Sequence, residues 1–116
     1  MKTIPSLPPP DTPWLLSKPV LDEAGFVGEL HLLAPGATRG TDRPAPGDTL
    51  LFVVSGSVTA GIGRSNYILD AETTLRIPAG RDHELRNPTG TLAKVLVITL
   101  PPRAVHLPDE PTLLPG

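Results

Sequence analysis

The chain has 116 residues and a mass of 12.2 kDa, which at roughly 100–200 residues per domain corresponds to a single domain. Its net charge is −2, so it lacks the basic excess that neutralises phosphates, and we expect no nucleic-acid partner. The absence of cysteine excludes disulfides, a thiolate nucleophile and cysteine-based zinc sites. Residues 1–13 contain no apolar run, and no segment approaches the roughly 20 apolar residues of a membrane span. We therefore expect a cytoplasmic protein with no membrane partner.

Proline marks both ends of the chain. The sequence holds 16 prolines and 11 glycines, which argues against a helical bundle because proline is costly inside helices. Residues 1–13 and 101–116 are predicted as extended proline-rich arms around a domain at 14–100. Apolar residues such as Trp14 and Leu113 suggest that parts of the arms dock on another surface, and a neighbouring subunit is one candidate.

Short apolar runs separated by turn residues fill the region between the arms. They occupy residues 26–34, 49–54, 57–63, 66–69, 73–78, 82–87 and 92–100. Ser55 and Gly56 are predicted to form a tight hairpin turn. The polar segment 35–49 carries three prolines and three glycines, and a loop of this length is usually functional or disordered. Six or seven short strands predict an all-β sandwich or barrel.

Two motifs resemble signatures of the cupin family. Residues 78–87 (PAGRDHELRN) follow the second cupin pattern, Pro-x-Gly-x-x-His-x-x-x-Asn. The first pattern is Gly-x5-His-x-His-x4-Glu-x6-Gly, and Gly36 and Gly56 supply its two glycines at the right spacing. Over roughly residues 30–100 the chain therefore resembles a small single-domain cupin. The resemblance implies a double-stranded β-helix, the cupin jelly-roll barrel, and a homodimer, since cupins are usually dimeric.

The first motif is degenerate at its functional positions. In the family, two histidines and a glutamate of this motif join the histidine of the second motif around one divalent metal. Carried over by position, the two histidines become Asp42 and Pro44, and the glutamate becomes Thr49. Only the fourth ligand is retained, as His83. Glu72 stands where the second motif usually begins with glycine.

These exchanges weaken the expected metal site. Protein sites for first-row metals usually present at least three ligands, mostly imidazole and carboxylate. The inherited positions offer His83 and Asp42, so these are the metal ligands if a divalent metal binds at all. Substitute ligands could come from His31, Asp48 or Asp82. We expect no metal cofactor.

The predicted interior suits a small organic ligand. Strand alternation puts Leu85 and Asn87 on the face of His83, and puts Thr49 and Leu51 together on another strand. Such a mostly apolar interior favours an organic molecule over an ion, although small barrels can also be filled by side chains alone. Asn87 could instead make a structural turn contact before Pro88. The predicted ligand-binding residues are His83, Thr49, Asp42, Leu51, Leu85, Asn87, Arg43 and Arg81.

Histidine and arginine side chains are the candidates for proton transfer and for anion binding. His83, without a metal, could titrate near neutrality and act as a general base, which makes it the candidate catalytic residue. Arg39 and Arg43 flank Asp42, and Arg81 lies just before His83. An arginine directed towards the barrel mouth could bind a carboxylate or a phosphate, whereas the alternative is solvated surface charge.

Three functions stay open at this point. The first is a cupin that binds a small organic ligand with the family metal site largely lost. The second is an enzyme of the dioxygenase or isomerase type, with substitute metal ligands or with His83 acting alone. The third is a structural dimerisation module, supported only by the apolar residues of the two arms.

Overall fold

The computed structural model describes residues 15–40, 45–102 and 110–114, and these ranges contain strands and no helix. The all-β prediction is confirmed. None of the described segments is a helix long and apolar enough to cross a membrane. The strands are β1 (Leu15–Glu23), β2 (Phe26–Leu33), β3 (Thr38–Gly40), β4 (Thr49–Ser55), β5 (Ser57–Ile62), β6 (Ser65–Asp70), β7 (Thr74–Ile77), β8 (Glu84–Arg86), β9 (Ala93–Thr99) and β10 (Thr112–Leu114).

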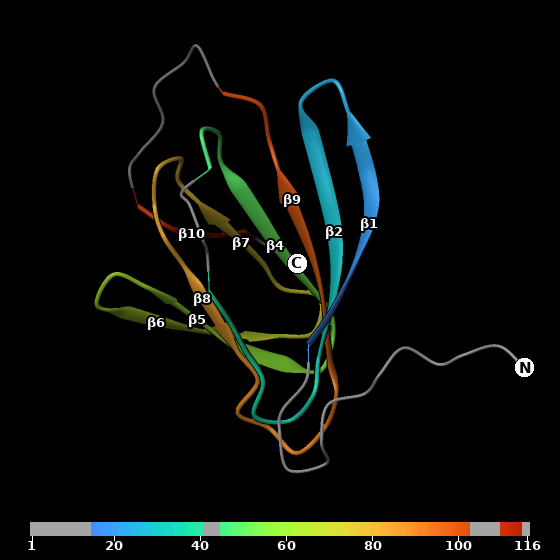
Figure 1. Ribbon diagram of the computed structural model, residues 1–116. Helices are drawn as coiled ribbons and strands as arrows, with labels where there is room; N and C mark the ends of the chain where they lie inside the picture. Colours follow the sequence, from blue (N-terminus) through green and yellow to red (C-terminus); the bar gives the residue numbers. More distant parts are fainter. Residues whose placement is uncertain (1–14, 41–44, 103–109, 115–116) are drawn as a thin grey trace, which may run out of the picture.

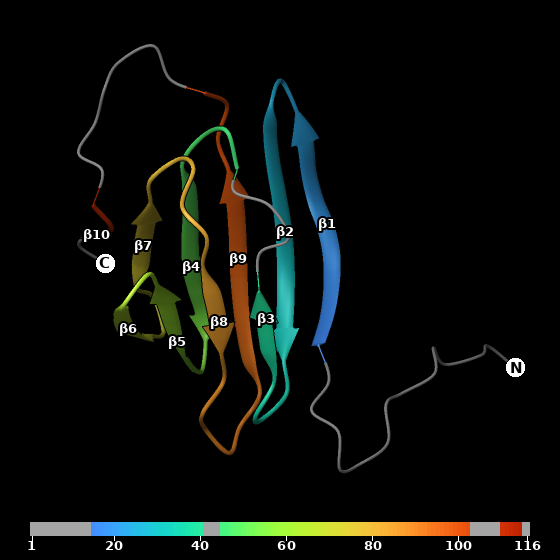
Figure 2. The same ribbon diagram turned by 60° about the vertical axis from the view of Figure 1, so that its left-hand side comes forward.

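The strands form two antiparallel sheets. The larger has the order β1-β2-β9-β4-β7-β10, and the smaller has the order β3-β8-β5-β6 (Figure 1). Figure 2 shows β1, β2, β9, β4 and β7 side by side across the larger sheet. Neighbours far apart in sequence, such as β2 with β9, give the crossovers of a jelly roll, as the resemblance predicted.

The turn at Ser55 and Gly56 differs from its prediction. β4 pairs with β7 and β9, whereas β5 pairs with β6 and β8, so this turn carries the chain between the two sheets and does not close a hairpin. Gly56 has φ 83°, and a Cβ there would lie 2.8 Å from the carbonyl oxygen of Leu92. Only glycine fits this corner, because both the left-handed backbone and the close packing exclude a side chain.

Three strands lie where none was predicted. β1 runs beside β2 despite Pro19, because the register shifts between Pro19 and Leu21, and proline is tolerated at such irregularities. β3 interrupts the segment predicted as a long polar loop and pairs with β8. β10 belongs to the predicted C-terminal arm and pairs with β7. The predicted N-terminal arm, residues 1–13, lies outside the described residues.

The interior has an apolar part and a polar part. Along the inner face of β4, Val53 and Leu51 are fully buried in the apolar core, and Thr49 follows at the polar end. The core residues are Leu33, Ala37, Leu51, Val53, Val58, Ala60, Ile62, Leu69, Leu75, Ile77, Leu85, Ala93 and Val95. Side chains therefore fill part of the barrel, and the polar part is left to form a site.

Candidate ligand pocket

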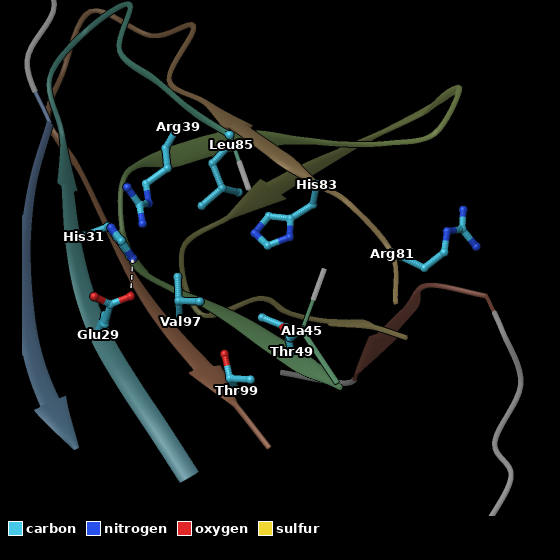
Figure 3. Close-up of a pocket in the computed structure, with 11 residues that line it drawn as sticks. Glu29, His31, Arg39, Ala45, Thr49, Arg81, His83, Leu85, Val97 and Thr99 are labelled. Atoms are coloured by element: carbon cyan, nitrogen blue, oxygen red, sulfur yellow. Dashed lines mark ion pairs between the residues drawn. The ribbon is translucent and has the colours of Figure 1, made fainter. Parts of the chain in front are cut away.

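A cavity of about 250 Å³ opens at the polar part of the barrel interior (Figure 3). At about 30 Å³ per liquid water molecule, this is roughly the space of eight waters, enough for a small organic molecule. Side chains of both sheets contribute to the wall. The lining residues are Glu29, His31, Arg39, Gly40, Ala45, Thr49, Arg81, His83, Leu85, Val97 and Thr99.

Strand pairing brings the lining residues together. Thr49 of β4 lies opposite Thr99 of β9, and Val97 of β9 lies opposite Glu29 of β2. Because alternate residues of a strand share a face, His31 joins Glu29 on the inner side of β2. In the smaller sheet, the pairing of β3 with β8 sets Arg39 opposite Leu85. The segment that leads into β8 places His83 at the same cavity.

His31 is held on both sides of its ring. It is only 2% exposed, its Nδ1 lies 2.7 Å from the Ser17 hydroxyl, and its Nε2 lies 3.8 Å from a carboxylate oxygen of Glu29. Burial lowers the pKa of His31, the Arg39 guanidinium lowers it further, and Glu29 partly offsets both effects. When the Ser17 hydroxyl donates to Nδ1, the neutral ring carries its proton on Nε2 and presents it to the pocket.

His83 meets a similar environment. Burial lowers its pKa, the positive charge of Arg39 lowers it further, and Asp82 partly offsets them. Both imidazoles are therefore held towards the neutral form, in which one ring nitrogen donates a hydrogen bond and the other accepts one. The pocket thus contains two bifunctional hydrogen-bonding groups, one from β2 and one from the segment that leads into β8.

The two arginines of the pocket are placed differently. Figure 3 shows the Arg39 side chain directed into the same space as His31, His83 and Leu85. The side chain of Arg81 points away from that group, towards the rim. The positive charge inside the pocket therefore comes from Arg39.

The donors that the structure describes do not fit a divalent metal. Within residues 15–40, 45–102 and 110–114, no three histidine, aspartate or glutamate side chains come together as a metal site would require. Asp48, a possible substitute ligand, forms a buried ion pair with Arg76 at 3.0 Å and accepts a hydrogen bond from the Ala79 amide. Thr49, at the family's glutamate position, offers only a hydroxyl, which is a poor ligand for such ions.

Four of the predicted ligand-binding residues line the pocket: Thr49, Arg81, His83 and Leu85. Asp42 and Arg43 fall outside the described residues. Leu51 does not line the pocket, because it lies one step further along the inner face of β4 and is fully buried in the apolar core. Leu51 therefore lies beneath the pocket, in the core, and not in its wall.

Asn87 also lies away from the pocket. Its side-chain amide donates to the carbonyl oxygens of Leu33 and Thr91, both at 2.8 Å. Its side-chain oxygen accepts from the amide of Thr89 at 3.0 Å and from the Thr89 hydroxyl at 2.7 Å. With its side-chain polar atoms engaged and only 1% of the residue exposed, Asn87 holds the turn before β9 against β2 and is not placed to contact a ligand.

For several lining residues, the sequence around them did not indicate a role at the pocket. Glu29, Val97 and Thr99 lie inside apolar runs that were predicted as strands without any assigned role. Strand alternation could have shown that Val97 and Thr99 share a face, but not which face looks inward. Arg39 was named among the arginines that could bind a carboxylate or a phosphate at the barrel mouth, but it was not among the predicted ligand-binding residues.

Comparisons with known proteins agree with the fold. A family model described as a cupin domain matches residues 29–99. The cupin domain of an XRE-family transcriptional regulator from Enterobacter cloacae is 24% identical with a TM-score of 0.70, over 77% of this chain and 98% of that one. A cupin superfamily protein from Desulfitobacterium hafniense is 24% identical with a TM-score of 0.68, over 76% and 78% of the two chains. A Thermus thermophilus protein is 25% identical with a TM-score of 0.69, over 77% and 85%. No curated protein matches the chain significantly.

Proposed function

Because the chain belongs to the cupin family, we propose that its barrel binds a small organic molecule directly through interior side chains, without a resident metal. One observation carries the proposal: the 250 Å³ pocket at the family's site is lined by histidine, hydroxyl and arginine groups, and no cluster of metal ligands is found among the residues that the structure describes. Leu85 and Val97 supply apolar wall, and His31, His83 and Thr49 supply directional hydrogen bonds. This mixture is typical of sites for small organic molecules.

Proton transfer on the bound molecule is the second candidate function. His31 and His83 line the same cavity and are both held towards the neutral form. One ring can accept a proton from a substrate while the other donates one, which is what a metal-free isomerase requires. His83 keeps its predicted role as candidate general base in this reading.

The proposed homodimer has a candidate surface on the first hairpin. Large apolar side chains of β1 and β2 are 39–50% exposed, namely Leu16, Val20, Leu21, Phe26 and Val27. Covering such side chains in a symmetric dimer removes apolar surface from water, which favours association. Light scattering should show about twice the 12.2 kDa chain mass at micromolar concentration, and a 12.2 kDa particle would contradict the dimer.

A thermal-shift screen with metal analysis tests the binding proposal. The protein is dialysed against EDTA, its metal content is measured by mass spectrometry, and small sugars, organic acids and amides are added at millimolar concentration. At 100 times its dissociation constant, a ligand stabilises the folded state by about 2.7 kcal/mol, a readily measured shift. We expect stabilisation without added metal. Stabilisation that requires one bound metal per chain would contradict the proposal.

Two variants on β9 test whether the ligand that stabilises the protein binds in the pocket. Val97→Phe places a larger side chain in the pocket, whereas Leu96→Phe makes a comparable enlargement on the opposite face of β9. We expect Val97→Phe to abolish the ligand-induced shift and Leu96→Phe to preserve it. An equal loss in both variants, or in neither, would place binding elsewhere.

A further inference from the structure

Arg39 carries a positive charge inside the pocket, and no carboxylate among the described residues pairs with it. It comes from β3, three residues long, and its side chain enters the cavity beside Leu85, its partner across the β3–β8 pair (Figure 3). Within the described ranges it forms neither a hydrogen bond nor an ion pair, and Arg39 is half-buried. A guanidinium keeps its charge at all physiological pH values, so removal from water is unfavourable unless an anion compensates it.

Among the described lining residues, Glu29 is the only carboxylate, and it is directed towards His31. Glu29 approaches the Nε2 of His31 at 3.8 Å, and its side chain is 39% exposed to solvent. The charge of Arg39 therefore faces the cavity itself, where it also disfavours a positive charge on either histidine. An anion entering the cavity would find one fixed positive charge beside the imidazoles of His31 and His83.

Part of the wall is apolar. Leu85 is 1% exposed and Val97 packs against the core, so both present hydrocarbon to the same cavity. A bare inorganic anion would leave this hydrocarbon surface uncovered, whereas the short chain or ring of an organic acid would cover it. The planar guanidinium matches a carboxylate through two parallel N–H···O bonds.

We propose that the ligand of this pocket is a small organic carboxylate, with its anionic group bound by Arg39 and its hydrocarbon part against Leu85 and Val97. The inference rests on the proposed ligand-binding function and specifies its chemical class. Arg39 binds the negative charge of the ligand, and the carboxylate of Glu29 opposes the binding of a second negative group in the same cavity.

Matched acids and amides provide the test. Isobutyrate, 2-hydroxyisobutyrate and benzoate, each with its uncharged amide, are titrated by calorimetry into EDTA-treated protein. We expect at least one acid to bind at least tenfold more tightly than its amide. Arg39→Gln should reduce the affinity for the acid at least tenfold while leaving the amide unchanged. Glu29→Gln should increase the affinity for the acid. Arg64→Gln removes the same charge from the exposed turn between β5 and β6 and should change neither affinity.

The outcomes separate this inference from the function on which it rests. Equal binding of acid and amide by the unmodified protein would overturn the carboxylate assignment and leave the binding proposal standing. Tighter binding of the acid with no loss in Arg39→Gln would overturn the role of Arg39. Binding of no acid or amide at ten millimolar would overturn the carboxylate assignment, and the binding proposal would fall with it only if the sugars of the screen also failed to bind. A melting temperature of Arg39→Gln equal to that of the unmodified protein confirms that the variant is folded in these measurements.

Discussion

Replacement of Asn87 by alanine separates a structural role of this motif residue from a ligand-binding role. The substitution removes four hydrogen bonds, of 2.7–3.0 Å, that join the turn at residues 87–91 to itself and to β2. Each such bond contributes about 0.5–1.5 kcal/mol net, and those that are only partly buried can be replaced in part by water. We expect Asn87→Ala to lower the free energy of unfolding by about 2–4 kcal/mol.

The assay combines unfolding with binding. At about 4 °C per kcal/mol for a domain of this size, the melting temperature should fall by roughly 8–16 °C. Binding of the tightest ligand from the screen, measured well below that temperature, should change by less than about twofold. Circular dichroism at fixed protein concentration follows the unfolding, because dimerisation would make the transition concentration-dependent. A melting temperature within about 2 °C of the unmodified protein, together with lost binding, would refute the structural role.

Three further predictions concern the framework of the site. Glu72 has φ 68°, a left-handed backbone conformation that is strained for a residue with a side chain. Glu72→Gly should relieve this strain and raise the free energy of unfolding by up to about 1 kcal/mol, whereas Glu72→Ala should not. Equal melting temperatures for both variants would contradict this reasoning. Asp48→Ala removes the carboxylate that pairs with the buried charge of Arg76, so it should lower the free energy of unfolding, measured in urea, by about 3–5 kcal/mol. A decrease of less than about 1 kcal/mol would contradict this reasoning. Because the pKa values of His31 and His83 are lowered in the folded protein, the unfolded chain binds more protons than the folded one once the pH falls below the ordinary histidine pKa of about 6.5. The free energy of unfolding should therefore be at its full value above that pH and should decrease as the pH drops towards 5.5. His83→Gln should flatten this pH profile, and an unchanged slope would contradict the assignment.

The fold was predictable at positions where the backbone conformation admits only glycine. Gly36, Gly56 and Gly80 all have φ near 80°, so the spacing of these glycines reflects the corners of the barrel and identifies the family. Turn signals show where the chain bends but not which strands then pair. Ser55 and Gly56 have the composition of a hairpin turn, and only the pairing of β4 and β5 with different partners shows a crossing between sheets.

The site was predictable only in part. His83, Thr49 and Leu85 follow from the motif and from strand alternation. Glu29 and Arg39 reach the pocket through pairings of β2 with β9 and of β3 with β8, which join segments roughly 45 to 70 residues apart. No local pattern encodes such a meeting. Asn87 shares the alternation of Leu85 but lies where β8 has ended, so its side chain organises the turn instead.

Methyl NMR of the pocket walls tests the central claim most directly. Protein labelled at leucine and valine methyl groups is freed of metal and titrated with the acid that stabilises it most. We expect saturable shifts at Leu85 and Val97, while the exposed Val20 and Leu113 stay unchanged. Shifts that appear only after a divalent metal is added, or that spare both pocket methyl groups, would contradict it.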